Sequence, residues 1–498
     1  MKTIKYFYNT LIISLAILAL QGCTKLLDQK PYDYPTINTF WQTGKDAETG
    51  LAGCYVELRS QLLNGDGGLA YFTYGDFPTQ VFGSGEWGQF PFQGHFEYFS
   101  GDVLSDYSGW YKTINAANTL IEKVPGIQLN KFNADITLAT NERDKIMGEA
   151  YFIRAYTYFY MARIWGTFPL MLKSISSASE AVNDVPYSTN TQILDQCLSD
   201  LTEAAKRLQW GYTSSNEQAV RANKGSVYAL IAHINMWRAR PNQPASGAPA
   251  FIAKAEAACD SVINKGGYQL VDSTAYASIF KGKSSEGIFE IEFNTANNEY
   301  FGNGGFTTLF LAKPIIANGR DYPIFNFSSD FLGLFNDPKD VRNSAFFYNL
   351  GGNNTMCTKY SSITYPTADK LTWRTDDNLI IFRLADIMLL RAEALTRLNR
   401  YTDARIWLNE VRNRAGIGDY SGTDANLANE VYIQMQKELF LEGHNLYDMV
   451  RTGKYATNPY YSAQRYNDEG YYWPVNVNLF LRNKYTQQTP YWSSRIQN

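Results

Sequence analysis

One long apolar segment constrains the fold of this chain more than any other feature. Between Arg143 and Trp165, apolar side chains occur on nearly every side of the helix that their spacing predicts. A helix that is apolar all round has to be covered by other elements, because an apolar face left in water costs free energy. The segment therefore predicts a core in which several helices pack around this one.

Helical periodicity also occurs before and after this segment. We predict further helices over residues 45–62, 192–208, 223–238 and 251–264. The best strand candidate is Gly287–Phe293, in which apolar and polar residues alternate with a period of two. These patterns predict a mostly α-helical chain with minor β-structure.

A helical hairpin is predicted near the C-terminal third of the chain. Apolar residues form one stripe over residues 381–395, and a second helix follows a short turn, with Thr402 as its N-cap and Gly416 as its stop signal. Ala392 and Ala404 permit a close approach of the two helices, although no strict 34-residue repeat is visible. The predicted fold class is a single α-helical domain of tetratricopeptide-like helix pairs that support long irregular loops.

Two long segments lack helical periodicity. Residues 71–111 hold 14 aromatic residues and seven glycines and contain no Lys or Arg, and residues 294–366 are rich in Gly, Asn and aromatic residues. Glycine frees the backbone and removes packing groups, which disfavours a helix in either segment. Since long ordered loops in a compact domain are usually functional, we predict structured loops that carry exposed aromatic rings.

These aromatic segments contain the candidate ligand-binding residues. Sugar rings have apolar C–H faces that stack on aromatic rings, while Asp, Asn and Gln side chains bind the hydroxyl groups. Trp87 lies in Gly85-Glu86-Trp87-Gly88, where glycines leave its ring with little local cover. A buried, loop-anchoring position is the alternative for each ring, because pockets use few of the rings near them. The predicted ligand contacts are Trp87, Asp76, Phe90, Phe92, Tyr300 and Phe301.

The N-terminus has the pattern of an export signal. Lys2 and Lys5 precede the apolar run Leu11–Leu20, which is too short to span a bilayer. Leu20-Gln21-Gly22-Cys23 then matches a bacterial lipobox, in which Cys23 would carry lipid. We therefore predict a signal peptide over residues 1–22 and a lipid anchor at Cys23, where each buried methylene contributes roughly 0.8 kcal/mol. The alternative is an ordinary secretory signal with a chance cysteine.

Composition limits the classes of function. The net charge is −3, from 45 basic and 48 acidic residues, and no basic stripe of the kind that binds nucleic acid is present. The three histidines lack metal-ligand spacing and no phosphate-loop motif occurs, so we expect neither a metal nor a cofactor. Without CxxC spacing, the four cysteines beyond the lipobox are predicted to be buried free thiols: Cys54, Cys197, Cys259 and Cys357. One or two disulfide bridges, which the sequence does not pair, are the alternative.

A glycoside hydrolase is the main enzymatic alternative, and an adhesive surface protein is a third class. A hydrolase would need two carboxylates that face each other across the scissile bond. The aromatic segment supplies candidates whose separation the sequence does not set: Asp76, Glu86, Glu97, Asp102 and Asp106. Glu149, Glu393 and Glu442 lie in predicted helical segments and are interpreted as partners of neighbouring arginines. We expect no enzyme, since no set of residues meets the geometric roles of an active site.

A series of motifs runs in order through nearly the whole mature chain. The most specific is Gly148–Tyr156 (Gly-Glu-Ala-Tyr-Phe-Ile-Arg-Ala-Tyr), which continues at Arg163–Leu170. The others are Cys23–Pro31, Thr39–Trp41, Leu51–Tyr55, Phe382–Asp386, Arg391–Ala394, Leu408–Gly416 and Lys437–Gly443. In sequence and order they resemble the SusD/RagB family of outer-membrane nutrient-binding lipoproteins from the Bacteroidetes.

The resemblance implies a function as well as a fold. It implies one domain over residues 23–498, with an N-terminal SusD-like part at about 23–285 and a C-terminal SusD/RagB part at about 286–498. Members are anchored to the outer membrane by lipid, facing the exterior. They bind an oligosaccharide without catalysis and deliver it, as a hinged lid, to a SusC-like TonB-dependent barrel transporter. Some branches bind peptides, which remains the alternative here.

Two motifs depart from the family pattern. Asn445 stands two positions after Glu442-Gly443, where the family usually has an arginine. The closing segment Trp473-Pro474-Val475-Asn476 lacks the second proline and the following acidic residue. Both segments are interpreted as structural, so these departures concern local packing more than function.

Overall fold

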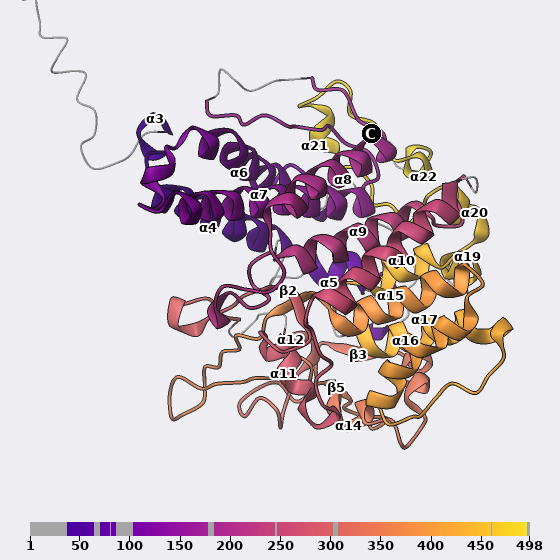
Figure 1. Ribbon diagram of the computed structural model, residues 1–498. Helices are drawn as coiled ribbons and strands as arrows, with labels where there is room; N and C mark the ends of the chain where they lie inside the picture. The colour runs from indigo at the N-terminus through magenta and orange to yellow at the C-terminus, as the bar shows by residue number, and fades with distance from the viewer. Residues whose placement is uncertain are drawn as a thin grey trace, which may run out of the picture.

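The computed structural model describes residues 37–63, 70–79, 81–85, 103–177, 184–244, 247–301, 307–459 and 461–495. Within these ranges the protein is mostly helical, with three two-stranded antiparallel sheets. The helices pack mainly in consecutive pairs, and the irregular segments gather at one end of the molecule (Figure 1). The predicted fold class is confirmed.

Helices of the N-terminal half form the first part of the helical layer: α3 (Ile37–Phe40), α4 (Gly44–Leu62), α6 (Trp110–Lys123), α7 (Ile136–Ile164) and α8 (Asn190–Arg207). α7 packs against α4, α6 and α8, and its C-terminal half is almost entirely buried, as predicted for the apolar segment. Capping boxes begin α4, through Thr43 and Asp46, and α8, through Thr189 and Gln192. Local sequence therefore sets these helix starts.

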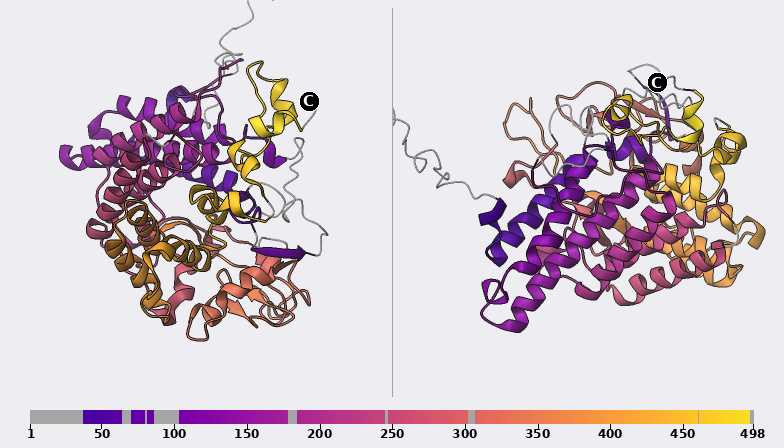
Figure 2. Two further views of the ribbon diagram at one scale, coloured as in Figure 1. Left: turned by 90° about the vertical axis from the view of Figure 1, so that its right-hand side faces the viewer. Right: turned by 90° about the horizontal axis from the view of Figure 1, so that it is seen from above.

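The layer continues with α9 (Lys224–Arg238), α10 (Ala248–Lys265), α15 (Leu384–Arg397), α16 (Tyr401–Arg414) and α17 (Asp424–Leu439). α9 packs on α10, α10 packs on α15, and α15 packs on both α16 and α17. Figure 2 shows these helices following one another along one side of the molecule. Ala392 and Ala404 are fully buried, which agrees with the predicted close contact of α15 and α16.

The predicted start of the helical hairpin is wrong. Ile381 lies in strand β6 (Leu379–Arg383), which pairs with β2 (Gly287–Ile291), and α15 begins only at Leu384. All five residues of each strand are buried, and a continuous apolar run cannot be distinguished from a buried helix by periodicity. The N-cap of α16 is Arg400, so Thr402 lies inside the helix.

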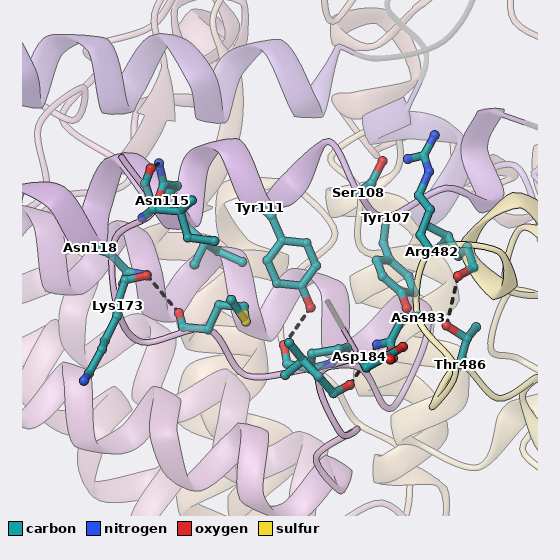
Figure 3. Close-up of a pocket in the computed structure, with 16 residues that line it drawn as sticks. Tyr107, Ser108, Tyr111, Asn115, Asn118, Lys173, Asp184, Arg482, Asn483 and Thr486 are labelled. Atoms are coloured by element: carbon teal, nitrogen blue, oxygen red, sulfur yellow. Dashed lines mark hydrogen bonds between the residues drawn. The ribbon is translucent and has the colours of Figure 1, made fainter. Parts of the chain in front are cut away.

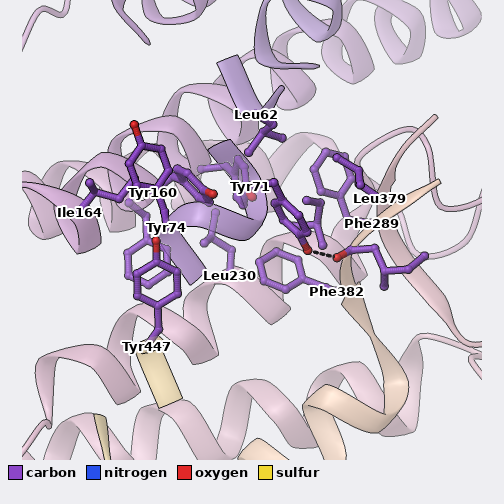
Figure 4. Close-up of a cluster of buried hydrophobic side chains, with 14 of the residues drawn as sticks. Leu62, Tyr71, Tyr74, Tyr160, Ile164, Leu230, Phe289, Leu379, Phe382 and Tyr447 are labelled. Atoms are coloured by element: carbon purple, nitrogen blue, oxygen red, sulfur yellow. Dashed lines mark hydrogen bonds between the residues drawn. The ribbon is translucent and has the colours of Figure 1, made fainter. Parts of the chain in front are cut away.

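Part of the aromatic segment 71–111 is also corrected. α5 (Ala70–Gly75) is a short buried helix, with Tyr71 and Tyr74 each 2% exposed in the aromatic core (Figure 4). Trp110, at the other end of the segment, is buried at the start of α6. A Cβ atom on Gly75 would lie 2.4 Å from the backbone of Gly443, so this glycine permits a close approach of α5 to that turn. Tertiary burial therefore stabilises a helix that the local sequence does not predict.

The remaining elements are short. Strands β1 (Phe82–Gly85) and β3 (Phe325–Phe327) pair with each other, as do β4 (Phe347–Tyr348) and β5 (Met356–Cys357). The short helices of the irregular region are α11 (Tyr276–Lys281), α12 (Thr307–Phe310), α13 (Ser329–Leu332) and α14 (Arg342–Ala345). The C-terminal ones are α18 (Asn445–Arg451), α19 (Lys454–Thr457), α20 (Ala463–Asn467), α21 (Val477–Phe480) and α22 (Pro490–Ser493).

A buried ionic network joins the helical layer to the irregular region. The Arg383 guanidinium lies 2.7 Å from the Glu442 carboxylate and 2.9 Å from that of Glu438, and Arg414 and Arg342 bind Glu438 from other sides. Burial alone would raise the pKa of Glu438, but these arginines hold it well below its usual value. The charges are therefore paired, as buried charges have to be.

The prediction for the four cysteines is confirmed. Cys54, Cys197, Cys259 and Cys357 are buried free thiols. Among the described residues, no helix is long and apolar enough to cross a membrane. Those residues also include no group of three or more His, Cys, Asp or Glu side chains that could hold a metal ion.

Candidate ligand-binding site

The aromatic segment is connected to the irregular region by one strand pair. Antiparallel pairing aligns Phe82 with Phe327 and Gly85 with Phe325. The Phe82 ring lies 5.4 Å from that of Phe327 and 5.7 Å from that of Phe310, so phenylalanines anchor the pair. Strand β1 therefore ends, at Gly85, beside the start of β3 at Phe325. We term the described residues of 307–375 the loop lobe.

The loop lobe exposes both apolar and cationic side chains. Tyr322, three residues before β3, is 66% exposed, and Leu371 is 64% exposed. Lys313, Arg320 and Lys370 are also exposed on this lobe. An exposed ring accompanied by hydrogen-bond donors is the combination that sugar stacking requires, and the sequence analysis had not singled out Tyr322. The sequence signal that could have identified Tyr322 is its position in an Asn- and Gly-rich segment shortly before strand β3.

Two further rings of the region are held by neighbouring groups. The Arg374 guanidinium lies 4.2 Å from the centroid of the Tyr300 ring, and Tyr300 is half-buried. The Tyr365 hydroxyl accepts a hydrogen bond of 2.8 Å from the amide of Ala317, and the Lys370 ammonium lies 5.4 Å from the Tyr365 ring. Both tyrosines are therefore fixed in orientation while part of each remains accessible.

The structure describes only some of the predicted ligand contacts, and those that it describes differ in burial. Trp87, Phe90 and Phe92 lie outside the described residues. Phe301 is only 6% exposed and packs 4.4 Å from the ring of Phe293, which contradicts an exposed position. Tyr300 is the one predicted contact, among those described, that retains accessible surface. Burial therefore separates the predicted contacts that the structure describes into core residues, Asp76 and Phe301, and a surface residue, Tyr300.

Asp76 is also buried, and its carboxylate has a structural role. It is 0% exposed and accepts hydrogen bonds from the amides of Leu441 (3.1 Å) and Gly443 (2.8 Å) and from the Asn445 side chain (2.9 Å). Burial raises the pKa of Asp76 to about 7, against these donors, which lower it. Both Leu441 and Gly443 have positive φ angles, so Asp76 stabilises a strained turn. We therefore omit it from the proposed ligand contacts.

The other candidate carboxylates that the structure describes bind groups of the protein itself. Glu149 binds Arg221 at 2.6 Å, and Glu393 binds Arg451, which confirms the prediction that both are ion-pair partners. Asp106 accepts a hydrogen bond of 2.7 Å from the amide of Ser108. Glu86, Glu97 and Asp102 lie outside the described residues.

A second candidate site is a pocket of about 240 Å³ (Figure 3). It is bounded by α6, by residues 169–175 and by the segment around α21. Tyr107 and Tyr111 face it from the α6 side, and Lys173 and Arg482 lie at its opposite ends. The sequence analysis did not predict this pocket, because its walls come from segments more than 300 residues apart.

Comparison with known proteins supports one family. A profile described as "Starch-binding associating with outer membrane" matches residues 76–236, and a profile described as "SusD family" matches residues 325–492. The chain belongs to the SusD/RagB family. As a SusD/RagB protein it joins proteins associated with carbohydrate and with the outer membrane.

SusD/RagB relatives match over nearly the full chain. A SusD-like protein of Formosa agariphila is 26% identical over 99% of this chain and 100% of its own length. A SusD-like protein of Bacteroides ovatus is 23% identical over 89% of this chain and 82% of its own length. A SusD homolog from Bacteroides thetaiotaomicron superposes with a TM-score of 0.78 at 25% identity, covering 91% of this chain and 99% of that structure. None of these relatives is named as an enzyme.

Proposed function

We propose that this SusD/RagB protein binds an oligosaccharide and delivers it, without cleaving it, to a SusC-like TonB-dependent barrel transporter. The observation that carries the proposal is the β1–β3 pair, which joins the start of an aromatic segment to a lobe with exposed aromatic and cationic side chains. The family description, starch binding at the outer membrane, supports a glycan as the ligand.

The proposed binding surface combines rings from two distant parts of the chain. Trp87 follows Gly85, the last residue of β1, by two positions in the sequence. Tyr322 precedes the paired strand β3 by three residues. We propose that Trp87 and Tyr322 stack on sugar rings while Arg374 holds Tyr300 beside them. A micromolar complex requires about −8 kcal/mol, which a few stacked rings and hydrogen bonds supply.

We further propose that the protein is held at the outer membrane through lipid on Cys23 and faces the exterior. The first described residue, Ile37, follows Cys23 by 14 positions, which allows a tether of up to roughly 50 Å when extended. A tether of this kind permits the protein to move relative to the barrel while it remains attached. Phe90 and Phe92 are proposed as additional ligand contacts within residues 86–102.

The proposal is tested with a panel of neutral and acidic polysaccharides and peptides. The mature chain carrying Cys23→Ser is run by affinity electrophoresis, and each retained ligand is measured by calorimetry. We expect Trp87→Ala and Tyr322→Ala each to weaken binding of one glycan by at least tenfold. Tyr485→Ala is the matched control, because Tyr485 is 42% exposed and follows α21, which lies at the opposite end of the molecule from the loop lobe (Figure 1).

Three results would contradict the proposal in different ways. Unchanged glycan affinity in both Trp87→Ala and Tyr322→Ala would show that the glycan does not bind at the loop lobe. Binding of peptides alone would favour the peptide-binding branch of the family. Release of shorter glycan products by the purified protein would show that it is an enzyme.

A further inference from the structure

The pocket beside α6 has walls that are mainly apolar. Ile114 and Leu479 are 1% and 5% exposed and close its inner side, and Tyr107 and Tyr111 add two aromatic rings. Residues 169–175, which we term the strap, form the facing wall. The volume of about 240 Å³ exceeds the roughly 150 Å³ of an apolar cavity that holds benzene and falls short of the roughly 300 Å³ at which drug-sized pockets begin. The space therefore suits one medium-length chain or a small ring system.

The polar groups of the walls are already used within the protein. The Tyr111 hydroxyl donates to the carbonyl of Pro169 at 2.6 Å, and the Asn115 amide binds both the N–H and the C=O of Ile175, at 2.7 and 3.1 Å. The Asn118 side chain donates to the strap carbonyls of Met171 and Lys173 at 2.9 and 3.0 Å. These bonds hold the strap on α6 and leave few groups for a ligand.

This arrangement disfavours both sugars and peptides as occupants. A sugar hydroxyl or a peptide amide that left water for this pocket would lack partners, at a cost of about 1–3 kcal/mol for each unpaired group. An alkyl chain or an aryl ring has no hydrogen bonds to lose, and it gains roughly 25 cal/mol for each Å² of apolar surface that it buries. The ligand that enters the pocket should therefore have an apolar body.

The two ends of the pocket add positive charge. Lys173 and Arg482 line opposite ends, both are exposed, and neither has an ion-pair partner within the described part of the chain (Figure 3). The one acidic lining residue, Asp184, is bound by Lys484 at 3.1 Å. Next to Arg482, Leu481 is 87% exposed and extends the apolar surface beyond the pocket. An anionic group at either end would therefore meet a cation that no described carboxylate binds.

We propose that this pocket binds the apolar chain of an anionic amphiphile, whose head group is held at one of the two cationic ends. A free fatty acid and an anionic membrane lipid share this chemistry. In Figure 1 and in the left-hand view of Figure 2, α6 and α21, which bound the pocket, lie at the opposite end of the molecule from the loop lobe, so this site is separate from the proposed glycan surface. An amphiphile bound here would give the protein a second contact with lipid besides Cys23.

The first test measures binding of decanoate, below its micellar concentration, to the mature chain carrying Cys23→Ser. Calorimetry should show one saturable site, and decanol should bind at least tenfold more weakly because it lacks the charge. Ile175→Trp, which fills the pocket, should weaken decanoate binding at least tenfold. Leu172→Trp is the matched control, since Leu172 lies on the same strap but is 42% exposed and does not line the pocket.

Charge variants identify the end that holds the head group. Arg482→Glu or Lys173→Glu should weaken decanoate binding at least tenfold, while Lys112→Glu, on the exposed side of α6, should leave it unchanged. Because Lys173 and Arg482 are exposed, we expect the charge variants to fold, so they test the proposal even if Ile175→Trp does not fold. Glycan retention should be unaffected in every variant, which distinguishes failure of this site from failure of the loop lobe.

A second arm distinguishes the two sources of ligand. Co-sedimentation with phosphatidylglycerol vesicles, abolished by the same charge variant and absent with phosphatidylcholine, would assign the pocket to membrane lipid. Decanoate binding without vesicle binding would assign it to free amphiphiles. The proposal is overturned by equal affinity for decanol, by full affinity in Ile175→Trp or in both charge variants, or by no binding in either arm.

Discussion

Asp76 links two segments that are 365 or more residues apart in the sequence. Its carboxylate accepts three hydrogen bonds from the turn that contains Leu441 and Gly443, and one donor is Asn445, the residue that departs from the family pattern. The departure therefore lies at a buried structural contact, which agrees with its interpretation as a matter of local packing. A polar residue in a glycine-rich aromatic segment can thus serve the core instead of a ligand.

Removing the Asp76 carboxylate should destabilise the fold. Asp76→Ala leaves three buried donors without acceptors, at about 1–3 kcal/mol each, so we expect a loss of at least 3 kcal/mol in the free energy of unfolding. Urea denaturation measures this loss. Asp330→Ala, at an exposed position of α13, is the control and should change stability by less than about 0.5 kcal/mol. A loss below about 1 kcal/mol for Asp76→Ala would contradict the structural role.

His444 should make stability depend on pH. Burial lowers the pKa of His444 to about 4, whereas the unfolded chain restores its value to about 6.5. The unfolded state therefore binds more protons below pH 6.5, and the stability contributed by neutral His444 is lost as the pH falls from about 6.5 to about 4. Asp76 and Glu290 act in the opposite sense, because burial raises the pKa of each to about 7 and the folded state retains their protons.

The variant His444→Gln separates the effect of the histidine on stability from that of these carboxyl groups. Between pH 7.5 and pH 5, wild-type protein should lose roughly 2 kcal/mol more stability than His444→Gln, which cannot take up a proton. Urea unfolding at the two pH values gives both numbers. Equal pH dependence in the two proteins would show that His444 is not held neutral by the fold.

At the scale of elements, α5 shows how a close contact places a helix. Its residue Gly75 lies against the backbone of Gly443, where a Cβ would be only 2.4 Å from backbone atoms. Gly75→Ala should therefore cost about 1–3 kcal/mol through overpacking. Gly53→Ala on the exposed face of α4 is the matched control, because nothing lies within 4 Å of its Cβ position and alanine favours a helix by about 1 kcal/mol. In thermal denaturation, the midpoint temperature should fall for Gly75→Ala and rise for Gly53→Ala.

The ionic network joins β6 to α17 and to the turn after it. All five N–H groups of Arg383 are used, in bonds to Glu286, Glu438 and Glu442. Because deleting one partner leaves buried charge uncompensated, Arg383→Met should cost about 3–5 kcal/mol. Lys206→Met removes only a surface pair with Glu203 and should cost less than about 1 kcal/mol. Chemical denaturation of both variants compares the two kinds of ion pair.

At the scale of the whole molecule, several contacts join the segments before and after residue 285, where the sequence analysis placed a boundary between two parts. β2 pairs with β6, β1 pairs with β3, and Asp76 binds the turn at Gly443. We therefore expect one cooperative unfolding transition, with coincident midpoints by circular dichroism and tryptophan fluorescence. Arg383→Met should lower both midpoints together. Two separate transitions would show that the parts unfold independently.

The helical layer was largely predictable because its signals are local. Periodic apolar residues and capping boxes of the Thr43–Asp46 kind determine where α4, α7, α8, α9 and α10 lie, to within a few residues at most ends. Strand β6 was missed because five consecutive buried residues fit a buried helix equally well. Which aromatic residues are exposed could not be predicted, since Tyr71 and Tyr322 occur in segments of similar composition.

The sequence by itself determined most of the long helices and the family, because apolar periodicity and motifs depend on residue type and spacing along the chain. Only the tertiary structure decided that Asp76 and Phe301 are buried, that Tyr322 is exposed and that a pocket forms between α6 and α21. Burial and pocket walls depend on which segments meet in space, and those segments lie hundreds of residues apart. The spacing of residues along the chain does not show which distant segments will contact each other.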